Sequence, residues 1–166
     1  HLILEKMEIL EKLDYKREAY NIVNEAKGNI ENCYAIGIRI YEETINPSLY
    51  AKNGKIKDLS VIGSIINTIL CENEYAKFYI FTTMRRSDLG KLRLDSNAVY
   101  INYENGYYDP IETLWMMSNF KNQIITNSTL YWWGAYLSSL KYNDHNIYAA
   151  DNFLNDDAMI KTWHTF

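Results

Sequence analysis

This 166-residue sequence is poor in glycine, proline, histidine and cysteine. It has only seven glycines, two prolines, three histidines and two cysteines, Cys33 and Cys71. Disordered and collagen-like chains are rich in glycine or proline, and small secreted domains are rich in cysteine, so these classes are excluded. The cysteines and histidines lack the spacing of zinc ligands, and no metal site is expected. We expect a reducing compartment, the cytoplasm, with the membrane periphery as a second option.

An excess of charge of one sign and a long apolar run are also lacking. The formal net charge is −4, which argues against a general binder of nucleic acid or of anionic membranes. The most apolar run, Val61 to Leu70, is about half the length of a membrane-spanning helix and contains polar residues, so no transmembrane segment is expected. The sequence begins with His1 rather than Met, and we expect a fragment or a processed form.

Apolar and aromatic residues, by contrast, are plentiful, at 48% and 14% of the chain. This length suffices for one core, and short β-rich runs alternate with helical segments. The expected strands, about five, are Cys33–Ile40, Lys77–Thr83, Ala98–Tyr103, Asn122–Thr126 and His145–Ala150. The expected helices are Leu2–Leu13, Lys16–Ala26, Val61–Leu70, Arg86–Lys91, Pro110–Phe120, Leu130–Leu140 and Asp156–Trp163. This alternation predicts one α/β domain with a doubly wound parallel sheet and helices on both faces.

The residues that follow each strand are the candidates for a ligand site. In doubly wound sheets, ligands bind at the carboxyl ends of the strands, near a switch in strand order. The segments expected at this edge are Arg39–Glu43, Thr82–Arg86, Tyr103–Asp109 and Thr126–Tyr131.

A polar turn, Thr126 to Thr129, lies between an expected strand and an aromatic helix. Its hydroxyls and its amide can cap the helix. They can also bind an anion together with the free N–H groups and the positive end of the helix dipole. The residue pattern leaves both interpretations open. Trp132 and Trp133 in the following helix are expected to pack in the core or against other helices rather than to form a ligand platform.

Arg39 is the one cation in an otherwise apolar run. A charge in such a place is costly unless it meets an opposite charge, and the planar guanidinium suits a phosphate. Glu42 and Glu43 follow closely, so a structural ion pair explains the same pattern. Both interpretations remain open.

Three segments, in their order and separation, resemble motifs of the α-1,2-fucosyltransferase family. That family has a His-x-Arg-Arg-x-Asp-like motif at a strand end, where this chain has Gly37 to Glu42, and a later strand like Phe-x-Ile-Phe-Ser-Asp, where it has Phe78 to Thr83. The most specific block is Met-Ser followed by Ile-Ile-x-Asn-Ser-Ser-Phe-Ser-Trp-Trp-Gly-Ala. It resembles Met117-Ser118 and Ile124 to Ala135. Together the matches cover Cys33 to Leu140.

The resemblance implies the fold and the partners. The chain would be the C-terminal, donor-binding half of a GT-B glycosyltransferase, with residues 1–30 as lead-in helices and residues 31–166 as a Rossmann-like nucleotide-sugar domain. An N-terminal acceptor domain would be missing. The donor would be a GDP-sugar, GDP-fucose in the family, and the acceptor a glycan hydroxyl. The transfer would invert the anomeric centre without a metal and without a cofactor other than the donor.

The resemblance also implies roles for individual residues. Arg39 would bind the diphosphate and take part in catalysis, and Glu42, at the position of the family's acid, would be the catalytic base. The other donor-binding residues implied are Thr82, Thr83, Glu112, Asn127, Ser128 and Thr129. Residues Tyr103 to Asp109, with Glu112, would face guanine or ribose.

The chemistry of the reaction is consistent with these roles. Glycosyl transfer builds negative charge on the departing diphosphate, and selective stabilisation of that charge is the catalysis. No Asp-x-Asp motif of the metal-dependent transferases occurs, so Arg39 and the polar turn are the available substitutes. The departures from the family pattern include these: Gly37 replaces His, Ile40 replaces the second Arg, Glu42 replaces Asp, and Tyr131 replaces the Ser before Trp-Trp.

Two other functions remain as alternatives. One is a glycosyltransferase of the same scaffold with a different nucleotide sugar, such as one that builds surface polysaccharide, in which Arg85 or Arg86 supplies the missing cation. The other is a non-catalytic relative in which the aromatic residues form a partner-binding surface. A dinucleotide-binding domain is excluded because no Gly-x-Gly-x-x-Gly motif occurs at a strand–helix turn.

Overall fold

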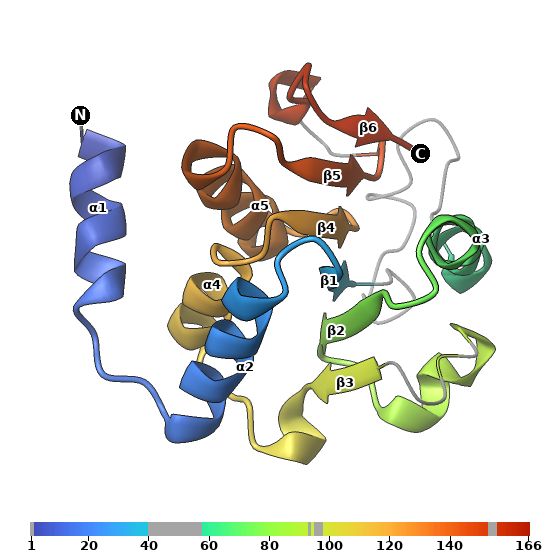
Figure 1. Ribbon diagram of the computed structural model, residues 1–166, viewed down its shortest axis with the longest axis horizontal. Helices are drawn as coiled ribbons and strands as arrows, with labels where there is room; N and C mark the ends of the chain where they lie inside the picture. The colour runs from blue at the N-terminus through green and yellow to red at the C-terminus, as the bar shows by residue number, and fades with distance from the viewer. Residues whose placement is uncertain (1, 40–57, 93, 95–97, 153–155) are drawn as a thin grey trace.

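The computed structural model describes residues 2–39, 58–92, 94, 98–152 and 156–166. Within them, six parallel strands form one sheet, and Figure 1 labels each of its strands. The strands are β1 (Cys33–Ile38), β2 (Lys77–Thr82), β3 (Ala98–Ile101), β4 (Asn122–Ile125), β5 (Asn146–Ala149) and β6 (His164–Thr165). The α-helices are α1 (Leu2–Glu11), α2 (Arg17–Gly28), α3 (Leu59–Glu72), α4 (Pro110–Met117) and α5 (Thr129–Lys141). Short 3-10 helices are η4 (Arg86–Leu92), η5 (Tyr103–Asn105) and η6 (Asp156–Ala158).

The strand order is β3-β2-β1-β4-β5-β6, which is that of a doubly wound Rossmann-like sheet. The predicted α/β class and the parallel sheet are therefore confirmed. The order reverses between β1 and β4, which pair from Tyr34–Asn122 to Gly37–Ile125. On the other side of β1, the register brings Ile38 level with Thr82 of β2. The residues after β1, β2 and β4 consequently meet at one edge of the sheet.

The two faces of the sheet are covered by different helices. Along β2, Tyr79 and Phe81 belong to the core under α2, α4 and α5, whereas Phe78 and Ile80 belong to the core that includes α3 and η4. This alternation follows from the period of two along a strand. Every residue of β1 is buried, as expected for a strand covered on both faces.

Local signals in the sequence account for several helix starts. The Asp58 carboxylate accepts hydrogen bonds from the N–H groups of Ser60 (2.9 Å) and Val61 (3.2 Å) at the start of α3. Asp109 caps α4 in the same way, and Pro110 occupies the first turn, where its missing N–H costs nothing. The helices predicted over Val61–Leu70 and Pro110–Phe120 are thus confirmed, with ends that differ by a few residues.

The helix predicted over residues Asp156 to Trp163 is wrong. Only the 3-10 turn η6 forms there, and a sixth strand, β6, then pairs with β5. Trp163 is 5% exposed, and its ring lies 6.0 Å from that of Trp132 on α5. Phe166 donates its N–H to Ala149. Burial of the indole and pairing along the open edge of β5 override the local helical pattern.

The two N-terminal helices pack on the α4–α5 side of the sheet. In α2, Ala19, Ile22, Val23 and Ala26 are buried in the same core as α4 and α5. The more peripheral α1 (Figure 1) is held at its end by Glu11, which accepts hydrogen bonds from Trp115 Nε1 (3.1 Å) and Lys141 Nζ (2.5 Å). Burial alone would raise the pKa of Glu11, but these two donors lower it.

Raising the pH above about 10 is expected to destabilise the protein, because the pKa values of Tyr15 and Tyr79 are higher in the folded state than in the unfolded chain. Burial, aided by the Glu11 carboxylate, raises the pKa of Tyr15 to about 12. Burial, aided by Glu25, also raises the pKa of Tyr79. An unfolded tyrosine ionises near pH ~10, so the folded state binds more protons above that pH and the free energy of unfolding falls between about pH 10 and about pH 12.

Urea unfolding followed from about pH 8 to about pH 12 measures this fall. The Tyr15→Phe variant has no phenol at this position, so its stability should fall less steeply over the same range. Identical pH dependence in the variant and the wild type would contradict the role given to Tyr15.

Candidate functional site

The structure brings two of the predicted segments together where the strand order reverses. Arg39 directly follows β1, and Thr126 directly follows β4. The backbone N–H of Arg39 donates to Thr126 Oγ1 at 2.7 Å, and the Thr126 hydroxyl donates to the Gly37 carbonyl at 3.1 Å. We call Arg39 and residues 126–129 the switch-point corner. The proximity expected from the topology therefore exists at the level of direct hydrogen bonds.

Arg39 is exposed, and no ion pair joins its guanidinium to another residue that the structure describes. Glu42, expected as the catalytic base, and Glu43, the other carboxylate offered as an ion-pair partner, lie outside the described residues. The described part of the chain therefore leaves the Arg39 side chain available to solvent and to a ligand.

The start of α5 supplies the second half of the corner. Ser128 is the N-cap residue and is 8% exposed, but its hydroxyl makes no capping hydrogen bond to the helix. Thr129, the first helical residue, is exposed. A capping role for the Ser128 hydroxyl is thus not realised. A helix start without a side-chain cap favours an anion, because its N–H groups and its dipole present positive charge.

Asn127 has a structural partner. Its side-chain amide donates to the Asn152 carbonyl at 2.6 Å and so ties the turn after β4 to the segment after β5. Of the three residues Asn127, Ser128 and Thr129, Asn127 therefore contributes at least partly by holding the turn in place.

A cavity of about 130 Å³ opens beside the corner, at the ends of β2 and β3. We call it the tyrosine pocket after its most prominent lining residues. Its walls include the predicted residues Thr82 and Thr83 and the tyrosines Tyr103, Tyr107, Tyr108 and Tyr131. None of the described residues that line it is charged. Ring faces and hydroxyls without charge suit an uncharged ring that carries hydrogen-bonding groups, such as a base or a sugar.

The corner and the pocket share the first turn of α5 through Tyr131. Its ring packs so closely on β1 that a Cβ added at Gly37 would lie 2.5 Å from Tyr131 Cγ. No positive φ is involved at Gly37, so the close approach itself requires glycine. Gly37 and Tyr131, two of the positions at which the chain differs from the resembled motifs, thus contact each other.

Glu112 does not line the pocket, although the resemblance led us to expect it near guanine or ribose. Its side chain is 8% exposed, and both carboxylate oxygens face Lys16. Oε2 accepts the Lys16 N–H at 3.1 Å, and Oε1 lies 3.3 Å from Lys16 Nζ. This carboxylate is already paired inside the protein.

The loop from η5 to α4 forms the outer wall of the pocket. Tyr103 and Tyr108 stack with their ring centroids 5.5 Å apart and their planes at 16°, and both are largely exposed. Tyr107, between them in the chain, is half-buried. Burial, and then the charges of Glu112 and Glu18, raise the pKa of Tyr107. Leu130, within the expected segment Thr126–Tyr131, also lines the pocket, whereas Thr113 lines it without having been expected there, because it carries no local signal of ligand binding.

The two arginines after β2 have different surroundings. The Arg86 guanidinium lies 4.8 Å from the centre of the Tyr100 ring, and the backbone N–H of Arg86 donates to Glu104 Oε2 at 2.8 Å. Arg85 is exposed. Arg86 is thus engaged by its own neighbours, which leaves Arg85 as the better candidate for an additional ligand cation.

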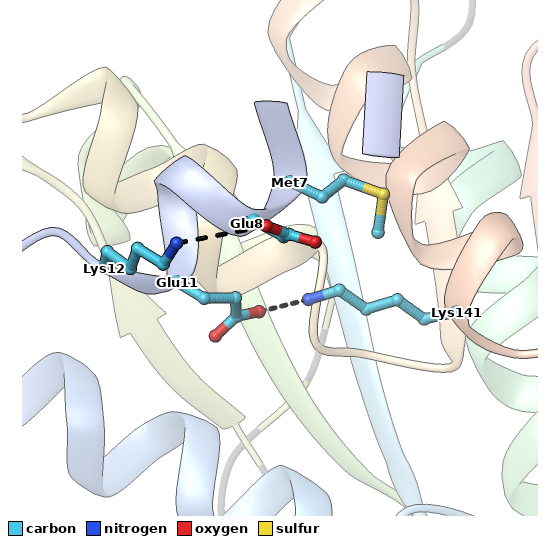
Figure 2. Close-up of a pocket in the computed structure, with 5 residues that line it drawn as sticks. All are labelled: Met7, Glu8, Glu11, Lys12 and Lys141. Atoms are coloured by element: carbon cyan, nitrogen blue, oxygen red, sulfur yellow. Dashed lines mark hydrogen bonds and ion pairs between the residues drawn. The ribbon is translucent and has the colours of Figure 1, made fainter. Parts of the chain in front are cut away.

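A larger hollow of about 480 Å³ lies between α1 and the end of α5. Figure 2 shows Met7 and Lys141 on its two sides, with ion pairs Glu11–Lys141 (2.5 Å) and Glu8–Lys12 (3.9 Å). None of the predicted site residues lines this hollow, and α5 reaches it at the end opposite to the switch-point corner.

Among the described residues, no group of three or more His, Cys, Asp or Glu side chains is placed to hold a metal ion. No helix among the described residues is long and apolar enough to cross a bilayer. Comparisons with models of protein families, with curated proteins and with solved structures found no match.

Proposed function

We propose that this chain binds a nucleoside diphosphate sugar and acts as the donor-binding half of a glycosyltransferase similar to the α-1,2-fucosyltransferases. The diphosphate would lie in the switch-point corner, and the uncharged base or ribose in the tyrosine pocket. The preferred donor is GDP-fucose, and the acceptor is a glycan hydroxyl supplied with a further domain.

One observation carries the proposal: Arg39, whose guanidinium has no ion pair among the described residues, and a helix start without a side-chain cap adjoin at the switch in strand order. The backbone N–H of Arg39 is hydrogen-bonded to Thr126 Oγ1, two residues before the Ser128 N-cap of α5. Doubly wound sheets bind their ligands at this point. Both groups present positive charge, which suits an anion such as a diphosphate.

The sequence resemblance adds specificity to this argument. Its most specific block, Ile124 to Ala135, spans the end of β4, the polar turn and the start of α5. The block therefore coincides with half of the corner. Gly37 and Tyr131, two positions at which the chain differs from the family motifs, contact each other, and Gly37 lies two residues before Arg39.

These residues could perform the chemistry as follows. As the bond between the sugar and the diphosphate breaks, negative charge grows on the departing phosphate oxygens. Arg39 would donate charged hydrogen bonds to those oxygens, and the α5 N–H groups would add fixed partial positive charge. The acceptor hydroxyl must lose a proton, and Glu42 is the carboxylate proposed to take it.

Replacing Arg39 with alanine is expected to weaken GDP binding by about tenfold or more, as loss of a charged hydrogen bond does. The free energy of unfolding should change little, because the side chain is exposed. Calorimetric titration with GDP and urea unfolding measure the two quantities. GDP should also raise the melting temperature of the wild type, and UDP should not.

Arg85→Ala compares the two candidate cations, since it removes the exposed arginine after the neighbouring strand that a different nucleotide sugar would use. It should leave GDP affinity unchanged. Stabilisation by UDP, or loss of binding in Arg85→Ala rather than in Arg39→Ala, would favour a different nucleotide sugar. Absence of binding to any nucleotide would overturn the proposal and favour a non-catalytic interaction domain.

A further inference from the structure

Lys16 links the N-terminal helices to the wall of the tyrosine pocket. It is the residue that precedes α2, 96 positions before Glu112 in the sequence. Its backbone N–H donates to Glu112 Oε2, and its ammonium group faces Glu112 Oε1 at 3.3 Å. One carboxylate in the first turn of α4 is therefore engaged at both of its oxygens by one residue.

The Lys16 ammonium has two further partners in the loop that leads to α4. Nζ donates to the Gly106 carbonyl at 2.6 Å and lies 3.5 Å from the centre of the Tyr107 ring. A lysine ammonium has three N–H donors. A carbonyl, a carboxylate and a ring face account for all three, so the group has little capacity left for a ligand.

These contacts hold a short loop at its start. Gly106 has φ +79°, which reverses the chain, and its carbonyl is held by Lys16. At the other end of the loop, the Asp109 side chain caps α4. Tyr107 and Tyr108 lie between these two fixed points, and both line the pocket. The position of Lys16 therefore decides where this wall stands.

We infer that Lys16 is a positioning residue for the tyrosine pocket: it fixes Tyr107 and its loop, and thereby the fit of the ligand's uncharged ring. Glu112, expected as a ligand-binding residue, orients Lys16 instead. The inference rests on the proposed function, because it concerns how tightly this pocket holds part of a nucleoside diphosphate. It makes the segment before α2 part of the binding site.

A double-mutant cycle between Lys16→Met and Tyr107→Ala tests the inference, with GDP affinity measured by calorimetry. Each single variant is expected to weaken GDP binding by about tenfold. Because Lys16 acts through Tyr107, the double variant should bind no more weakly than Tyr107→Ala alone. Additive losses would overturn the inference, as would single variants that bind GDP as tightly as the wild type.

Two other variants separate positioning from a loss of folding. Lys16→Arg keeps donors for the Gly106 carbonyl and for Glu112, and should recover most of the affinity. Lys12→Met removes an exposed lysine of the same N-terminal segment and should leave GDP affinity unchanged. If Lys16→Met does not fold, Glu112→Gln takes its place in the cycle. If Lys16→Arg binds GDP no more tightly than Lys16→Met does, the positioning role is contradicted.

The outcome also distinguishes this inference from the proposed function. A wild type that binds no GDP overturns both. A wild type that binds GDP through Arg39, with Lys16→Met unaffected, overturns the positioning role alone.

Discussion

Gly37→Ala is expected to lower the free energy of unfolding by about 1–3 kcal/mol, the usual cost of overpacking a core. The added Cβ would lie 2.5 Å from Tyr131 Cγ and 2.9 Å from Tyr131 Cβ. Rotation of the Tyr131 side chain cannot relieve the second contact, so the first turn of α5 has to move. This turn begins at Thr129, directly after the N-cap Ser128, and both residues belong to the switch-point corner. We therefore also expect GDP affinity to fall by about tenfold or more.

Gly63→Ala is a matched control for this change. Gly63 lies within α3, and a Cβ added there has nothing within 4 Å. Because alanine favours a helix more than glycine does, this variant should be more stable by about 0.5–1 kcal/mol. Urea unfolding and GDP titration of both variants measure the effects. Equal stability of the two variants would mean that Tyr131 yields without cost.

Phe120→Ala is expected to have the largest effect on stability, a loss of about 3–5 kcal/mol. The side chain is 1% exposed, and its ring lies 5.0 Å from that of Tyr79 and 6.0 Å from that of Phe81. Alanine would leave a cavity between the turn after α4 and the middle of the sheet. The backbone around Phe120 is held by hydrogen bonds from Gln123 and Ser138 to its carbonyl, so little collapse is expected.

This loss should be confined to stability. Phe120 precedes the amino end of β4, whereas the switch-point corner follows its carboxyl end. The folded fraction of Phe120→Ala should therefore bind GDP with wild-type affinity. Chemical unfolding measures the stability, and GDP titration at low temperature measures the affinity. The control is Tyr75→Ala, at a residue 74% exposed, which should change neither the free energy of unfolding nor the GDP affinity. A decrease in the free energy of unfolding well below about 3 kcal/mol would show that the core collapses around the cavity.

The fold could be predicted well from the sequence because its signals are local. Buried runs such as residues 33–38 identify strands, and capping residues such as Asp58 identify helix starts. The prediction failed at residues 156–163, where the burial of Trp163 and the free edge of β5 decided the structure. Both of those depend on partners distant in the sequence, which a periodicity cannot register.

The candidate site was predictable only in part. The strand–turn–helix pattern was enough to indicate that Arg39 and the polar turn belong to one edge. It could not indicate that Glu112 is paired, because its partner Lys16 lies in the N-terminal segment. Nor could it indicate that Gly37 and Tyr131 contact each other, since this contact arises only when α5 packs on β1.

The sequence by itself determined the kind of sheet, the order of its strands and helices, and the edge at which polar residues gather, because each follows from short-range periodicity and capping. Tertiary packing alone decided which of those polar groups are paired. An ion pair or a close ring contact needs two segments to come within a few ångströms of each other, and their distance in space is set by how the layers pack. Lys16 and Glu112 illustrate this: each is an ordinary charged residue in its own segment, and only the packed fold makes them partners.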